Sequence, residues 1–97
     1  MKFSQHIVVN VADESALLTL MDEAGGDTAP GGLLGMRVLK FRDKPGRYVI
    51  QADFDSWESA EQSNDRPETQ EWAGRLASVI EGDPKYENLD VLREMTP

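Results

Sequence analysis

The sequence of 97 residues contains no cysteine. This absence excludes disulfide scaffolds, thiolate metal sites and thiol catalysis. There is also only one histidine, His6, which cannot form a histidine-rich metal site by itself. Basic residues are few, with 10 lysines and arginines against 18 acids and a net charge of −8. Because such a field repels phosphate backbones and the cations are scattered along the chain, we predict no nucleic-acid partner.

Long apolar runs are missing as well. No run approaches the roughly 20 residues that span a bilayer, so we expect no membrane partner. The segment MKFSQHIVVNVADES lacks the apolar region and small-residue cleavage site of a signal peptide, and we therefore expect a cytoplasmic protein. The length suits a single domain over residues 1–97.

Apolar residues follow strand and helix periods in turn along the chain. Strands are predicted at 2–11, 33–42, 47–54 and 85–94, and helices at 13–24 and 56–81, the latter broken at 64–67. The segment GGDTAPGG at 25–32 is predicted to be a loop within the domain, with Gly25 and Gly26 ending the first helix. The sequence Lys44-Pro45-Gly46 favours a type II turn, which makes the two central strands a hairpin.

Side chains that cap helices stand where each helix is expected to begin. Asp13 is the predicted N-cap of the first helix, and Asp55 or Ser56 of the second. Capping-box spacing occurs in the acidic pairs at 55/58 and 65/68, the latter with proline in the first helical turn. A metal site at the acids around Asp55 is the less favoured alternative, because no calcium-loop pattern is present; we predict no metal.

The order β-α-β-β-α-β predicts a ferredoxin-like α+β fold. In this fold a four-stranded antiparallel sheet carries both helices on one face. The other face is predicted to hold Val8 and either Met36 and Val38 or their neighbours, a set too apolar to remain exposed. We therefore expect a homodimer that closes sheet on sheet through the open face.

Several functional classes share this order of elements, and three of them lack their residues here. An RNA-recognition module needs exposed aromatics and glycines on its third strand, but that strand reads RYVIQADF. A metal chaperone of this fold needs a Cys-x-x-Cys pair. A phosphate cradle needs arginine and glycines after the first strand, where this chain has VADES.

The chain resembles the dimeric α+β barrel superfamily, particularly the antibiotic biosynthesis monooxygenase-like domains. The resemblance rests on HIVVNVADESALLTLM, on the hairpin GLLGMRVLKF…GRYVIQADF, and on DFDSWESAEQSNDRPETQEW. It implies a pocket between sheet and helices and, in some members, oxygenation of an aromatic compound without metal or flavin, so no cofactor is expected. Haem-degrading members use asparagine, tryptophan and histidine at positions that here hold Ile7, Ser63 and Ala73, which argues against haem oxygenation.

Seven residues are candidates for the site. His6 is a possible base and Arg37 a possible catalytic partner that orients a carbonyl or phenolate; either could instead lie in the dimer interface or face solvent. The candidate ligand-binding residues are Asn10, Tyr48, Gln51, Trp57 and Trp72. For the tryptophans the alternative is a core position, and for Asn10 a turn or ladder position.

Two functions remain open at this point. The first is a cofactor-independent monooxygenase-like enzyme acting on a small aromatic compound of quinol or anthrone type. The second is a non-catalytic domain that binds a small molecule or a partner on the same dimeric scaffold. The missing family residues favour the second, and the overall resemblance favours the first.

Overall fold

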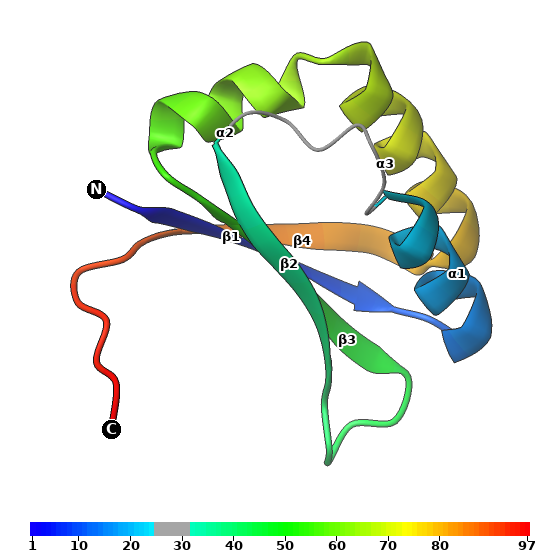
Figure 1. Cartoon of the computed structure of the whole chain (residues 1–97). Coiled ribbons are helices and arrows are strands. Elements are labelled where there is room, and N and C mark those ends of the chain that lie inside the picture. The colour runs from blue at the N-terminus through cyan, green and yellow to red at the C-terminus, as the bar shows by residue number, and fades with distance from the viewer. Residues whose placement is uncertain (25–31) are drawn as a thin grey trace.

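The computed structural model describes residues 1–24 and 32–97, and Figure 1 shows their arrangement. The strands are β1 (Phe3–Asn10), β2 (Leu33–Lys40), β3 (Arg47–Phe54) and β4 (Glu81–Asp90), and the helices are α1 (Glu14–Ala24), α2 (Trp57–Asn64) and α3 (Pro67–Val79). The loop predicted at 25–32 and its helix-ending glycines lie outside the described residues, except for Gly32.

The four strands form one antiparallel sheet in the order β2-β3-β1-β4. Within residues 1–24 and 32–97, α1, α2 and α3 lie over the same face, and no helix covers the opposite face (Figure 1). This is the ferredoxin-like arrangement predicted from the order of elements, and the fold prediction is confirmed. The chain beyond β4 leaves the sheet on the side away from the helices.

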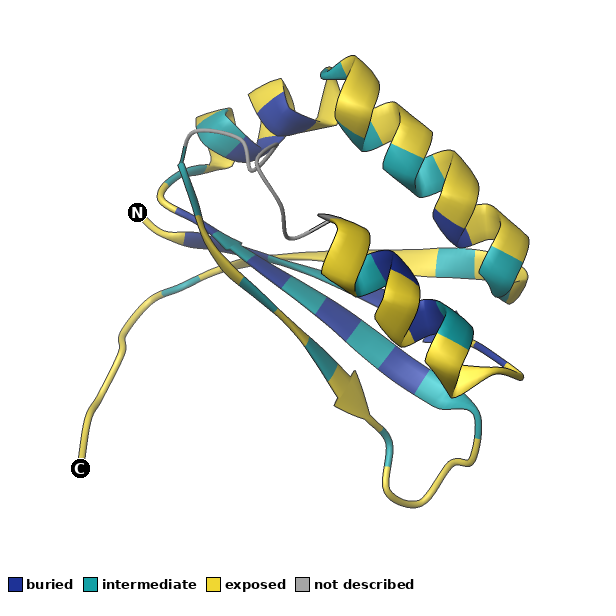
Figure 2. Cartoon of the chain, turned by 45° about the vertical axis from the view of Figure 1, so that its right-hand side comes forward, coloured by how far each residue is buried: buried dark blue, intermediate teal, exposed yellow. Residues whose placement is uncertain are grey.

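The core lies between the sheet and the helices. Alternate residues of β1 and β3 point toward the helices, which gives β3 its regular pattern of buried and half-buried positions (Figure 2). One cluster packs Ile7, Val9 and Ile50 against leucines of α1 and α3. A second cluster joins Phe3, Ala52, Phe54 and Ala60 beneath α2. Full burial of each valine, leucine, isoleucine or phenylalanine side chain in these clusters stabilises the fold by roughly 1.5–3 kcal/mol.

The faces of β2 differ from the alternation predicted for it. Leu33 pairs with Phe54, but the next pair joins Gly35 to Asp53, so one extra residue is inserted between them. Because of such a bulge, the residues that follow it point to the opposite sheet face from the one that simple alternation would give them. Met36 and Val38 therefore pack against the helix-side core, and Leu34 is exposed. Simple alternation along β2 would place Leu34 on the same face as Met36 and Val38, whereas the structure places it on the other face.

β4 begins earlier than predicted and ends at Asp90. Val8 pairs with Lys85 and Asn10 with Glu81, so residues 82–84 bulge opposite Val9. Gly82 has φ +73°, a conformation that glycine adopts without strain, and it begins the bulge instead of ending α3. β4 is an edge strand, where the missing N–H of a proline is tolerated, and this explains how the segment contains Pro84.

The predicted turn and most predicted caps are confirmed. Arg47 N–H donates to the Lys44 carbonyl at 3.1 Å, and Gly46 has φ +81°, as a type II turn requires. Asp13 accepts from the backbone of α1 at 3.0 Å, and Ser56 caps α2 by accepting from Ser59 N–H at 3.1 Å. The capping boxes predicted at 55/58 and 65/68 were wrong, because the N-caps of α2 and α3 are positions 56 and 66, and no side chain caps α3.

Tyr48 ties β3 to the start of α1. Its hydroxyl donates to Glu14 Oε1 at 3.0 Å, and Lys40 Nζ lies 3.0 Å from the same oxygen. The hydrogen bonds from Lys40 and Tyr48 lower the pKa of the Glu14 carboxyl. Burial, and then the neighbouring carboxylate, raise the pKa of Tyr48. Glu14 also raises the pKa of the Lys40 ammonium.

These three shifts predict how stability depends on pH. A lowered carboxyl pKa stabilises the folded state above the ordinary value of about 4.3, and this contribution is lost as the pH falls. The raised pKa values of Tyr48 and Lys40 stabilise the folded state below about pH 10, and this contribution is lost as the pH rises. The urea midpoint of Glu14→Gln should therefore lie below wild type at neutral pH, and the difference should shrink at both extremes. Asp22→Asn on the same helix is the control; an equal pH-dependent difference there would contradict the prediction.

Candidate functional site

A cleft with two lobes opens between the sheet and the paired helices α2 and α3. The inner lobe has a volume of about 110 Å³ and apolar walls, including Leu33, Met36, Ala52 and Phe54. The outer lobe, of about 400 Å³, reaches toward β4 between α2 and α3. Pockets for small organic ligands typically combine such apolar walls with a few convergent polar groups.

Polar side chains gather where the lobes meet. Gln5, Asn64, Thr69 and Trp72 line both lobes. Asn64 is the last residue of α2, and Thr69 lies in the first turn of α3, so the break between these helices brings their side chains together. The break exists because Pro67 cannot continue α2, since it lacks the N–H that a helix interior requires.

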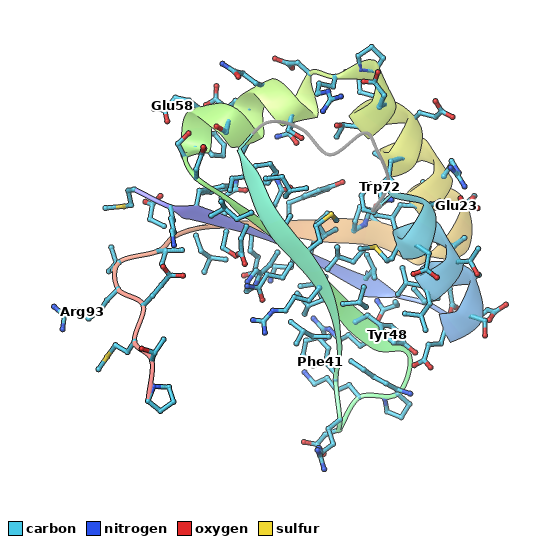
Figure 3. All side chains as sticks on the ribbon, viewed as in Figure 1. Glu23, Phe41, Tyr48, Glu58, Trp72 and Arg93 are labelled. Atoms are coloured by element: carbon cyan, nitrogen blue, oxygen red, sulfur yellow. The ribbon has the colours of Figure 1, made fainter. Side chains whose placement is uncertain are left out.

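Trp72 carries the most distinctive polar atom in the cleft. Its side chain projects from α3 into the space over the sheet (Figure 3). The indole Nε1 is buried and has no hydrogen-bond partner among the described residues. A buried donor without a partner costs about 1–3 kcal/mol, which a ligand oxygen in the cleft would recover by accepting from it.

Aromatic side chains wall the outer lobe. Trp57 and Tyr86 line it from α2 and β4. The Trp57 ring stands edge-on to Phe3, with ring centroids 4.9 Å apart and an interplanar angle of 71°. This contact fixes Trp57 although the residue is partly exposed, and it gives the lobe a firm flat wall against which a planar ligand can stack.

Ionisable groups are scarce around the cleft. Among the described lining residues, Glu68 is the only one in the inner lobe and Tyr86 the only one in the outer lobe. Glu68 Oε2 lies 3.6 Å from Arg66 Nε at the start of α3. The cleft therefore offers one carboxylate beside neutral donors and acceptors.

Gly32 holds the edge of the cleft in place. Its carbonyl accepts from Asp55 N–H at 2.8 Å, which joins the entry of β2 to the segment that leads into α2. Gly32 has φ +88°, and a Cβ at this position would lie 2.5 Å from Ser59 Oγ. Ser59 in turn donates to Asp55 Oδ1 at 2.6 Å. No other residue type fits here, because both the backbone conformation and the space require glycine.

Three of the predicted site residues lie on the open sheet face. His6 is opposite Gln51, and Gln51 is opposite Arg37, in one row across β1, β3 and β2. Arg37 Nη2 donates to Gln51 Oε1 at 3.0 Å, and Gln51 Nε2 donates to Asp53 at 3.2 Å. None of the three lines the sheet–helix cleft as described. Their predicted roles stay predictions, on a surface separate from the cleft.

The other four predicted residues are divided. Trp57 and Trp72 line the cleft. Tyr48 is buried under α1, and its hydroxyl is bonded to Glu14; it lies outside the described cleft lining (Figure 3). Asn10 is exposed at the end of β1. The structure therefore brings two of the seven residues together at the cleft, and their ligand-binding role remains a prediction.

Sequence reasoning missed most of the polar residues of the cleft, among them Gln5, Asn64, Glu68 and Thr69. A signal for Glu68 was present, because it precedes Trp72 and Leu76 at spacings of four residues and so begins their stripe of α3, at its exposed end. A charged residue on an otherwise apolar stripe indicates a site. Gln5 had a comparable signal, since it shares the parity of Phe3 and Ile7 on β1.

Two further searches covered the described residues. No group of three or more histidine or acidic side chains in residues 1–24 and 32–97 is placed to hold a metal ion. In the same part of the chain, every helix is too short or too polar to cross a membrane.

Comparison with known proteins gives structural matches and no sequence matches. No protein-family model and no curated protein matches the sequence. SnoaB, a cofactor-independent oxygenase from Streptomyces nogalater, superposes with a TM-score of 0.81 at 15% identity, over 99% of this chain and 97% of that one. Rv0793 from Mycobacterium tuberculosis gives 0.80 at 16% identity, over 99% and 100%. A candidate antibiotic biosynthesis monooxygenase from Chloroflexus aurantiacus gives 0.76 at 16% identity, over 99% and 98%.

The strand order and the helix-covered face define a ferredoxin-like α+β protein. Within that class, the chain has the fold of the antibiotic biosynthesis monooxygenase-like proteins. The resemblance drawn from its sequence is confirmed at the level of the fold. A shared fold does not by itself assign an activity, which has to be argued from the cleft.

Proposed function

We propose that the protein binds a small aromatic molecule of quinol or anthrone type in the sheet–helix cleft and promotes its oxygenation without metal or flavin. The observation that carries the proposal is the buried, unpartnered Nε1 of Trp72, a residue that lines both lobes. On this proposal the flat apolar walls accept the ring, and the Trp72 indole N–H donates to a ring oxygen. The oxygenase activity of SnoaB, which shares the fold, supports the same direction.

The cleft residues favour the anionic form of such a ligand. Trp72 Nε1, the Asn64 amide and the Gln5 amide can donate hydrogen bonds to a phenolate or enolate oxygen. Donors fixed in a partly dry site stabilise developing charge without having to reorganise during the reaction. The electron-rich anion can then react with dioxygen, while the protein supplies orientation, stacking and exclusion of water.

A non-catalytic binding domain is the second candidate. It is favoured by the position of His6 and Arg37, because the residues predicted to act as base and orienting group lie on the opposite sheet face. On this interpretation the cleft binds the same class of ligand and leaves it unchanged.

Oxygen consumption separates the two candidates. With an anthrone-type substrate, the first predicts protein-dependent uptake of one dioxygen for each quinone formed. Because Trp57 and Trp72 both line the cleft, ligand binding should quench intrinsic fluorescence. Quenching without uptake above the buffer rate would support the binding domain and refute the oxygenase. Neither signal would refute both.

We also propose a homodimer through the open sheet face. Leu34, Leu39 and Leu89 on or beside this face are all partly exposed. Ser4 on the same face is only 6% exposed, yet its hydroxyl has no partner among the described residues. A second copy packed against the sheet would cover the leucines and bring polar groups near Ser4, which supports the sheet-on-sheet arrangement.

A further inference from the structure

We infer that Glu68 is the general base that removes a proton from the ligand in the cleft. This inference rests on the proposed oxygenase function and names the group that starts the reaction. Glu68, Trp72 and Leu76 are spaced by four residues, so they form one stripe on α3. Leu76 on that stripe is 1% exposed in the core, and Trp72 lines the cleft one turn before it. The carboxylate of Glu68 stands one turn before the indole, where the stripe reaches the mouth of the cleft.

Glu68 is the one ionisable residue among the described residues that line the inner lobe. From α3 itself, Arg66 Nε lies 3.6 Å from Glu68 Oε2 and orients the carboxylate. Across the cleft, β1 presents the neutral amide of Gln5, and α2 presents the neutral amide of Asn64. The phenol of Tyr86 on β4 lines the outer lobe. No other described residue that lines either lobe is ionisable. The side chain of Glu68 is 52% exposed, so the carboxylate stands at the mouth of the inner lobe, and the walls of the lobe beyond it are apolar.

The chemistry balances with dioxygen as the co-reactant. Glu68 takes a proton from the ligand CH₂ group, and the electron pair stays on the ligand as an enolate. The reactive carbon then bonds to dioxygen, which is reduced to a peroxide anion. This anion takes the proton back from Glu68 to give a hydroperoxide, which loses water and leaves a carbonyl group. One CH₂ group and one O₂ become one carbonyl and one water, and Glu68 ends as a carboxylate.

The test compares Glu68→Gln with Glu71→Gln. Glu71 is an exposed acid of the same helix and lies outside both lobes, so its variant controls for charge and helix stability. Glutamine keeps the shape of Glu68 but cannot accept the proton. The turnover number for oxygen uptake should fall by about 100-fold or more in Glu68→Gln, since general bases contribute about 10²–10⁴-fold. The dissociation constant measured by fluorescence should stay within about threefold of wild type. Glu71→Gln should match wild type in both measurements.

A second substrate distinguishes a base from a structural residue. An analogue acidic enough to be ionised in the assay buffer needs no base, so Glu68→Gln should oxygenate it at nearly the wild-type rate. Glu68→Asp keeps a carboxylate and should retain intermediate turnover with the ordinary substrate. Equal losses on both substrates, or wild-type turnover in Glu68→Gln, would overturn the role of Glu68 while leaving the oxygenase function intact. An inactive wild-type protein would instead overturn both.

Discussion

Changing Leu39 to aspartate is expected to convert the proposed dimer to a monomer. Leu39 is opposite Val49, and Val49 is opposite Val8, so the three form an apolar row across the open sheet face. In a two-fold sheet-on-sheet dimer the substitution enters the interface twice. Each aspartate would lose hydration without gaining a partner, at an effective cost of several kcal/mol. Two such groups should weaken the dimer by more than about 10³-fold, because every 1.4 kcal/mol is tenfold.

The fold itself should survive this substitution. Leu39 is 39% exposed in the single chain and lies on the side away from the helices, so the core is untouched. Leu18→Asp is the matched control, since Leu18 is 45% exposed but lies on α1 away from the sheet. Sedimentation at micromolar concentration should give dimers for wild type and Leu18→Asp and monomers for Leu39→Asp. A wild-type monomer, or dissociation by Leu18→Asp alone, would contradict the open face as the interface.

Replacing Trp72 with phenylalanine should weaken ligand binding without weakening the fold. Phenylalanine keeps an aromatic wall but removes the indole N–H. A ligand oxygen bonded to that group would lose about 0.5–1.5 kcal/mol, or more if it is charged, so we expect the dissociation constant to rise about tenfold. In the free protein the substitution removes a buried donor that has no partner among the described residues. The melting temperature should therefore change little, except for a small decrease caused by the smaller volume of the phenylalanine side chain.

Trp57→Phe provides the comparison. Trp57 lines the outer lobe but contributes mainly a ring that stands edge-on to Phe3, and phenylalanine preserves much of that contact. Its effect on the dissociation constant should be under threefold. Isothermal titration with a phenol or quinone is the appropriate measurement, because each substitution also removes part of the fluorescence signal. If both variants bind as wild type does, Trp72 Nε1 is not the contact that holds the ligand.

The fold could be predicted because its signals are local. Alternation in RYVIQADF, the Lys44-Pro45-Gly46 turn and the Asp13 cap each determine the backbone within a few residues. Bulges were not predictable in the same way. The irregularity after Leu33 and the one at 82–84 arise from pairing between strands, and no local pattern indicates where an extra residue is inserted. The start of β4 was consequently predicted incorrectly, and simple alternation misplaces Leu34 on β2.

The site was less predictable than the fold. Residue chemistry drew attention to His6 and Arg37, but strand parity places them across the sheet from the cleft. The shape of the cleft depends instead on the angle between α2 and α3. Tertiary packing, not local sequence, sets that angle. Asn64 looked like part of a helix break and Glu68 like part of a cap, yet both line the inner lobe. Trp57 and Trp72 were found because an aromatic on an inward helix face is informative whether it packs in a core or lines a pocket.

Gly32 has a consequence for how this cleft can vary among related sequences. It is not among the residues that line either lobe, yet a side chain there would collide with Ser59 and displace α2. A shift of α2 would move Asn64, at the far end of that helix, relative to Trp72. A substitution at Gly32, which does not line the cleft, would therefore be expected to change which ligand the cleft prefers. A mutational library restricted to the lining residues would therefore miss changes in ligand specificity that arise from position 32.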